Sequence, residues 1–119
     1  MSTILSLHVH AQGHYVLVHI GGELDIATAS DTRDFLLSAV AECGNLVVDV
    51  TEVTFADATG INALLAASRH AVRSGGWLRL VGPCPQMRRV LQILRISMLL
   101  PTYDTACAAC ADTVDTTPG

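Results

Sequence analysis

Apolar and polar residues alternate along the first twenty positions of the chain. From residue 3 to residue 10 one side of the alternation is mainly apolar, and from Tyr15 to Ile20 the apolar side is formed by Val16, Val18 and Ile20. A repeat of two residues is typical of a β-strand with one buried face. Gly13 separates the two runs, so the pattern predicts a β-hairpin at the start of the chain.

The next segment has the spacing of a helix. Thr28 and Ser30 are both good N-cap residues, an apolar stripe runs through residues 36–40, and Gly44 follows as a closing residue. The run Leu46–Val50 after it is almost wholly apolar and rich in β-branched residues. Such a run is typical of a central strand buried on both faces.

A second helix is predicted to begin near Thr59, because apolar residues from Ile61 to Val72 recur at i, i+3, i+4 and i+7. The elements expected after it are a strand at Trp77–Val81, a helix opened by Pro83 and Pro85, a short strand at residues 99–103 and a last helix from Asp104 or Thr105 through Cys107 and Cys110.

The predicted order, with helices alternating with apolar strands, indicates an α/β fold. We expect a small, mostly parallel sheet with an antiparallel hairpin at its N-terminal edge and about four helices. A chain of 119 residues is long enough for one domain. We expect that domain to span residues 1–111, followed by a polar, flexible tail at residues 112–119.

Composition narrows the function classes. Charged residues make up 15% of the chain and the formal net charge is -4, so no broad basic surface for nucleic acid is expected. The cluster of Arg88, Arg89 and Arg95 is interpreted as a solvated helix face. No apolar run is long enough to cross a membrane, and residues 1–9 do not resemble a signal peptide. We therefore expect a cytoplasmic protein with reduced cysteines and without membrane insertion.

Few residues suggest chemistry. No glycine-rich phosphate loop and no nucleophile elbow is present. His8 and His10 share a strand face, but no carboxylate or cysteine has matching spacing, so we expect no metal and no cofactor. Cys107 and Cys110 form a Cys-x-x-Cys, for which packing of small residues is favoured and a redox pair stays open. The chain is therefore not expected to be an enzyme.

One βα junction stands out. The buried strand runs into Asp57-Ala58-Thr59-Gly60, where a helix is predicted to begin. Unpaired N–H groups and the positive end of the helix dipole face outward at such a place and favour an anion, including a phosphate on a nearby hydroxyl. An ordinary N-cap formed by Asp57 explains the same residues.

Several segments together resemble a known family. They are Gly22-Glu23-Leu24-Asp25, Val48-Asp49-Val50 through Phe55, Asp57-Ala58-Thr59-Gly60-Ile61, Gly75-Gly76 and Met87-Arg88-Arg89-Val90-Leu91. In this order and at this spacing, covering nearly the whole chain, they resemble the anti-sigma factor antagonists, which are single-domain proteins of the STAS superfamily. The resemblance implies a STAS-like fold.

The resemblance also implies a bacterial partner switch that regulates transcription. In that family the unphosphorylated protein binds an anti-sigma factor, which is also a kinase, and so frees the sigma factor. Phosphorylation at the start of the second helix blocks binding, and a phosphatase resets the switch. Carried over residue by residue, the partner contacts are Gly22, Glu23, Leu24, Asp25, Asp57, Ala58, Thr59, Gly60 and Ile61.

The chain departs from the family pattern at the phosphoacceptor. The family has Asp-Ser-[Ser/Thr]-Gly, and Ala58 stands where the acceptor hydroxyl belongs. Thr59 could act as a substitute, the switch could be permanently unphosphorylated, or the alanine could be an engineered lock. An alternative function, a cytosolic STAS subunit of a lipid-transport ATPase, needs no acceptor, but the complete Gly-Glu-Leu-Asp segment favours the antagonist.

Overall fold

The computed structural model describes residues 7–12, 15–106 and 108–109. In chain order these residues form β1 (Leu7–Gln12), β2 (Tyr15–Leu24), α1 (Ala29–Glu42), β3 (Asn45–Ala56), α2 (Ala58–Arg73), β4 (Trp77–Val81), α3 (Pro85–Leu94) and β5 (Thr102–Tyr103).

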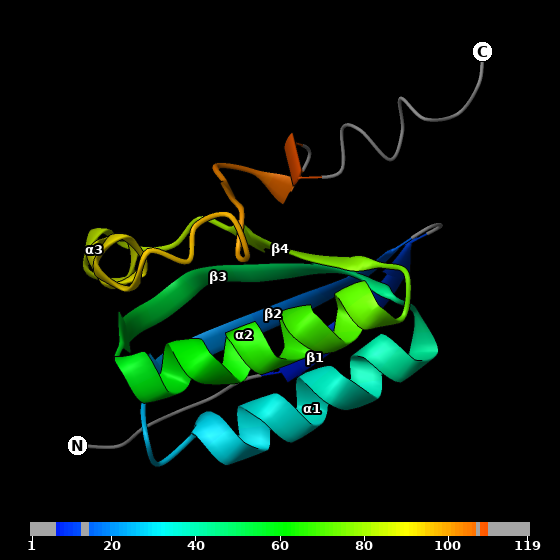
Figure 1. Cartoon of the computed structure of the whole chain (residues 1–119), viewed down its shortest axis with the longest axis horizontal. Helices are drawn as coiled ribbons and strands as arrows, with labels where there is room; N and C mark the ends of the chain where they lie inside the picture. The colour runs from blue at the N-terminus through cyan, green and yellow to red at the C-terminus, as the bar shows by residue number, and fades with distance from the viewer. Residues whose placement is uncertain (1–6, 13–14, 107, 110–119) are drawn as a thin grey trace.

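The strands form one sheet in the order β1-β2-β3-β4-β5, so β3 occupies the middle position. β1 lies at the edge and runs antiparallel to β2, whereas the other neighbouring pairs are parallel. α1 and α2 lie side by side across one face of the sheet (Figure 1). The mostly parallel α/β sheet predicted from the sequence is therefore confirmed, with the run Leu46–Val50 at its centre.

The main core lies between the sheet and the pair α1 and α2. From the sheet it takes the alternate residues Val16, Val18 and Ile20 of β2 together with Leu46, Val48 and Val50 of β3, and from the helices Leu36, Val40, Leu64 and Leu65. Val47 points to the opposite face and joins a smaller cluster with Val81 and Ala109. β3 is therefore buried on both faces, as its continuous apolar run predicts.

β3 is longer than the apolar run indicates. It continues to Ala56, and beyond Asp49 it pairs only with the end of β2, because β4 already ends at Val81. Glu52, Thr54 and Phe55 in this extension are exposed. The extension has several polar residues and lacks the continuous apolar pattern from which a buried strand is predicted. Backbone pairing with β2 holds the strand from Val50 to Ala56.

Three complete helices lie within the described part of the chain, against about four expected. At the place of the expected fourth helix, Ala106, Ala108 and Ala109 are helical. The Thr105 hydroxyl accepts from Ala108 N–H at 3.0 Å, and the Thr105 carbonyl accepts from Ala109 N–H at 3.0 Å. Cys107, Cys110 and the tail at 112–119 lie outside the described residues, as does Gly13 in the expected hairpin connection.

Two helix boundaries agree with the prediction. α1 ends at Glu42, and Gly44 follows directly after its C-cap Cys43. α2 begins at Ala58, within the predicted segment Asp57-Ala58-Thr59-Gly60. No helix in the described part of the chain has the length and apolar character needed to cross a membrane.

Candidate functional site

The ends of β2 and β3 bring two of the singled-out segments together. Glu23 is paired with Phe55, and Leu24 with Ala56, at the carboxyl ends of these parallel strands. Just beyond, the N–H of Asp57 donates to the carbonyl oxygen of Leu24 at 3.0 Å. The Gly22–Asp25 segment therefore lies beside the start of α2, and Glu23, Asp25 and Asp57 occupy one end of the domain.

Asp57 is the N-cap of α2. Its Oδ1 accepts a hydrogen bond from the N–H of Gly60 at 2.8 Å, and its carbonyl oxygen accepts from Ile61 N–H at 2.9 Å. This is the ordinary capping arrangement, and it uses one of the four N–H groups that a helix start leaves without an intrahelical partner. Ala58 and Thr59 follow as exposed residues in the first turn.

The loop from Glu23 to Thr28 is held by its own polar groups. The hydroxyl of Thr28 donates to the carbonyl of Glu23 at 2.8 Å and accepts from Asp25 N–H at 3.1 Å. Asp25 Oδ1 accepts from Ala27 N–H at 3.0 Å. Thr28 is the N-cap of α1 by position, yet its side chain makes no capping bond to the helix, because it is engaged in this loop. The loop presents Ile26 at its tip with a fixed backbone.

A side chain from α3 that sequence analysis did not select forms two hydrogen bonds with the end of β3. Gln86 Nε2 donates to the carbonyl of Ala56 at 2.7 Å, and Gln86 Oε1 accepts from the N–H of Ala56 at 2.9 Å. Its amide thus takes the place of a neighbouring strand where β4 has ended. A glutamine near the start of a helix has no distinctive sequence signal, because its partner is 30 residues away.

The predicted contact residues differ in what they expose. Gly22, Glu23, Asp25 and Asp57 are half-buried, whereas Ala58 and Thr59 are exposed. Leu24 and Ile61 are fully buried in the main core, and Gly60 is buried beneath Leu24. These three residues position the site, and the expectation that Ile61 forms surface with Asp57 was wrong, because a helix that begins at Ala58 turns Ile61 inward with Leu64 and Leu65.

Two apolar residues that sequence analysis did not select are exposed here. Ile26 is 78% exposed and Phe55 is 42% exposed. Ile26 also borders a shallow groove of about 310 Å³ between the starts of α1 and α2, whose other lining residues include Arg33, Thr59, Asn62 and Ala63. An exposed apolar side chain next to a groove, such as Ile26, is a feature of protein-binding surfaces.

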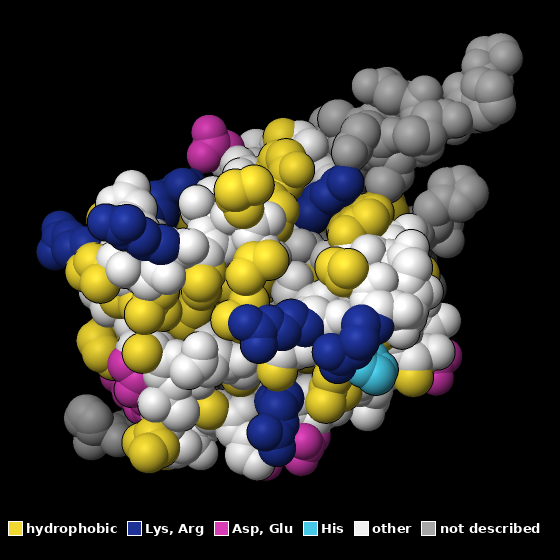
Figure 2. Space-filling view, viewed as in Figure 1, with side chains coloured by type: hydrophobic (Ala, Val, Ile, Leu, Met, Phe, Trp, Pro, Cys, Tyr) yellow, Lys and Arg dark blue, Asp and Glu magenta, His cyan; other side chains and the backbone are white. Residues whose placement is uncertain are grey.

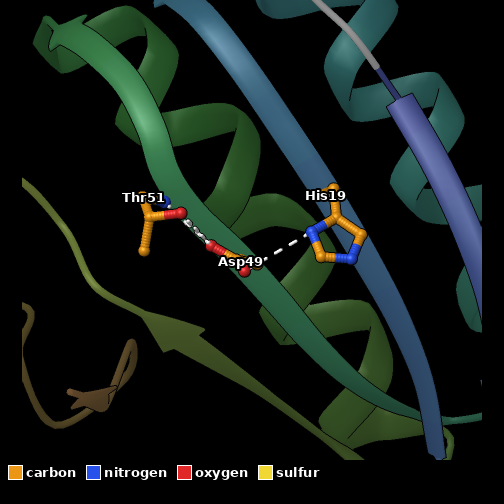
Figure 3. Close-up of polar contacts among 3 residues, drawn as sticks. All are labelled: His19, Asp49 and Thr51. Atoms are coloured by element: carbon orange, nitrogen blue, oxygen red, sulfur yellow. Dashed lines mark hydrogen bonds and ion pairs between the residues drawn. The ribbon is translucent and has the colours of Figure 1, made fainter. Parts of the chain in front are cut away.

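On the sheet face opposite to α1 and α2, a histidine side chain lies beside a carboxylate. His19 Nδ1 lies 3.4 Å from Asp49 Oδ2, and Asp49 Oδ1 accepts from the N–H and hydroxyl of Thr51 at 2.9 and 2.7 Å (Figure 3). Among the described residues, no group of three or more potential ligands could hold a metal ion. Cys43 and Cys84 are free thiols, and Cys107 and Cys110 lie outside the described residues.

A family model decides the identity of the fold. The model for the STAS domain matches residues 6–109, which is most of the chain. The chain belongs to the STAS domain family. The resemblance seen in the sequence is thereby confirmed, and the site at the start of α2 lies inside the matched STAS domain.

Two relatives of this chain have names that refer to the control of sigma factors. An anti-sigma F factor antagonist of Paenibacillus polymyxa is 23% identical over 104 residues, covering 84% of this chain and 89% of the relative. A protein of Mycobacterium tuberculosis, whose name proposes that it is an anti-anti-sigma factor, is 32% identical over 100 residues, covering 82% of this chain and 68% of the relative.

The fold also matches a solved structure of such a protein. The crystal structure of an anti-sigma factor antagonist from Mycobacterium paratuberculosis has a TM-score of 0.83, with 24% sequence identity over 94% of this chain and 96% of the other. This likeness establishes that the backbone architecture is shared.

Proposed function

We propose that this STAS domain is an anti-sigma factor antagonist, which binds an anti-sigma factor and thereby controls transcription. The observation that carries the proposal is the surface at the start of α2, where Ala58 and Thr59 are exposed beside the fixed loop that presents Ile26. Relatives named as antagonists, one from each of two organisms, support the same function.

The chemistry of this surface suits a protein partner. Ile26 supplies exposed apolar area in the loop after β2, Phe55 supplies more at the end of β3, and the partly exposed carboxylates of Glu23, Asp25 and Asp57 lie on the same two segments. Apolar anchors of this kind contribute most of the binding energy when a partner excludes water from them, and the charged rim sets orientation and partner choice. We assign the function to binding, in the cytoplasm, with no chemical step by the chain itself.

This sequence differs from the family in the residue on which control by phosphorylation depends, because Ala58 stands where the family has a hydroxyl. In our proposal the partner is an anti-sigma factor kinase, and a phosphate near position 58 would add about two negative charges to an apolar interface and weaken it. Ala58 cannot accept a phosphate, so the protein binds its partner constitutively unless Thr59 serves as the acceptor. A phosphatase is needed only in that second case.

The test is a binding measurement with the anti-sigma factors of the source organism, by calorimetry on the purified proteins. We expect Ile26→Asp to weaken binding by about tenfold or more, because it places a charge at an apolar anchor. The matched control is Ile93→Asp on α3, an equally exposed apolar residue at 70% exposure, which should leave the affinity unchanged. Equal losses in both variants, or no binding to any anti-sigma factor, would refute the proposed function.

A second candidate function is favoured by Ala58 alone. A cytosolic STAS subunit of a lipid-transport ATPase requires no phosphoacceptor, so an alanine there is unremarkable. Affinity capture from the source organism separates the two candidates. The antagonist brings down a small kinase-like protein, whereas the transporter subunit brings down membrane-embedded components.

A further inference from the structure

A second hollow lies away from the site at the start of α2. Its volume is about 430 Å³, and it is bordered by the second half of α2, by β4 and by the segment from Met98 to Tyr103. The nearest lining residue of α2, Ser68, is ten positions from Ala58, which is about 15 Å along a helix. A cavity of this size falls within the range that holds small organic ligands.

The wall of this pocket is mainly apolar. Val72, Trp77, Leu78, Leu99, Pro101 and Tyr103 line it. Ser68 borders it too, but its hydroxyl is already engaged, since it donates to the carbonyl oxygen of Leu99 at 2.8 Å. The lining therefore offers apolar contact and no side-chain carboxylate or amide that could read the edge of a nucleobase.

The charged groups at the pocket all have one sign. Arg69 and Arg73, which are exposed and one helical turn apart on α2, line it together with Arg79 of β4. Like charges at this spacing repel each other. Arg79 is placed by its neighbours, because its guanidinium carbon lies 3.9 Å from the centre of the Trp77 ring and its Nη1 donates to the carbonyl of Ala109 at 2.9 Å.

This local excess of positive charge belongs to a wider asymmetry of the chain. Residues 58–103 contain six arginines and no aspartate or glutamate, although the whole chain has a net charge of -4. Figure 2 shows several of the basic side chains set among apolar surface on the face that carries α2. An arrangement that gathers cations around an apolar hollow favours a ligand that is negative at one end and apolar at the other.

We propose that this pocket binds a small amphipathic anion, an aliphatic carboxylate in which the hydrocarbon chain enters the hollow and the carboxylate lies between Arg69 and Arg73. Guanidinium groups form paired, charge-assisted hydrogen bonds with carboxylates. The apolar lining, which includes Leu99, Val72 and Trp77, accommodates a flexible chain without requiring polar readout.

The protein contains its own reporter for this site. Trp77 is the only tryptophan of the chain and it lines the pocket. We therefore expect sodium decanoate, added to the full chain below its micelle concentration, to change the tryptophan fluorescence saturably. Octanoate should bind about tenfold more weakly, because two fewer methylene groups are buried. Decyltrimethylammonium, with the opposite charge on the same chain, should produce no saturable change.

Substitutions locate the site. Arg69→Gln and Arg73→Gln should each weaken decanoate binding by about threefold, and the double variant by about tenfold, which are the losses typical of partly exposed ion pairs. Arg89→Gln on α3 is the matched control, since this exposed arginine does not line the pocket, and its affinity should equal that of the parent. Val72→Trp, at a side chain that is 61% exposed, should block the pocket without disturbing the core.

Several outcomes would overturn the proposal. They are the absence of saturable binding of decanoate, equal binding of decanoate and decyltrimethylammonium, equal losses for Arg73→Gln and Arg89→Gln, and tighter binding of ATP than of decanoate, which would indicate a nucleotide site. Because these measurements use no partner protein, and Ile26→Asp should bind decanoate normally, failure here is distinguishable from failure of the proposed antagonist function.

Discussion

Gly60 lies so close to Leu24 that a side chain would not fit between them. A β-carbon added to Gly60 would be 2.2 Å from the carbonyl oxygen of Leu24, which is the same oxygen that accepts the N–H of Asp57. The contact joins the first turn of α2 to the end of β2. It therefore sets the distance between the Glu23–Asp25 loop and the exposed residues Ala58 and Thr59.

Gly60→Ala should destabilise the protein, although alanine is normally the better helix former. The new methyl meets a backbone carbonyl, which cannot move away as a flexible side chain can, so we expect a loss of about 1–3 kcal/mol in the free energy of unfolding. Urea titration measures it. Gly21→Ala is the control, since its methyl would approach no closer than 3.4 Å to Glu52 Cβ. A stabilised Gly60→Ala variant would contradict the close contact.

Gln86→Ala should destabilise the end of β3. The substitution leaves the buried N–H and carbonyl of Ala56 without the Gln86 amide, and an unsatisfied buried group costs about 1–3 kcal/mol. Gln86→Glu should be no better at neutral pH, because a carboxylate offers no donor to the Ala56 carbonyl. Gln92→Ala on the exposed side of α3 should change stability by less than about 0.5 kcal/mol. A Gln86→Glu variant as stable as the parent would show that the donor is unimportant.

Arg95→Gly should stabilise the protein. Arg95 ends α3 in the left-handed conformation with φ of 56°, and it is the one described non-glycine residue with a positive φ. We expect relief of this backbone strain to increase the free energy of unfolding by about 1 kcal/mol. A higher midpoint temperature of thermal unfolding measures this gain. Arg89→Gly, the same change inside α3, should instead destabilise by about 1 kcal/mol. If both variants lose stability alike, the left-handed cap is not strained.

The sequence predicts those elements that depend on the burial or chemistry of their own side chains, and it does not predict those that depend on backbone pairing or on contacts distant in sequence. The middle of the sheet is predictable because Leu46–Val50 has to be buried on both faces, and the capping role of Asp57 follows from its side-chain chemistry. The extension of β3 to Ala56 is held by backbone pairing with β2. Because backbone groups are the same for nearly all residue types, such pairing cannot be predicted from the residues. Gln86 acts on Ala56 across 30 residues, which no local pattern records.

The candidate site shows the same division. Family-like spacing correctly brought Glu23, Asp25 and Asp57 together, because two parallel strands that end side by side deliver both segments to one place. Ile61 was assigned to the surface by carry-over from the family, although the i, i+3, i+4, i+7 stripe to which it belongs indicates the buried face, and it is fully buried. Exposure of Ile26 depends on the loop held by Thr28, so an isolated isoleucine in the sequence could not indicate it.

The parent chain should not take up phosphate from its partner kinase, whereas Ala58→Ser should gain one phosphate. Phosphoryl transfer depends mainly on positioning, and in the proposed function the acceptor position is that of Ala58, in the exposed first turn of α2. Thr59 is displaced from it by about 100° around the helix and lines the groove beside α1. Intact-mass measurement after incubation with the kinase and ATP decides the matter, with Thr59→Ala in the parent as the control that should change nothing. One phosphate on the unmodified chain, mapped to Thr59, would instead make Thr59 the switch.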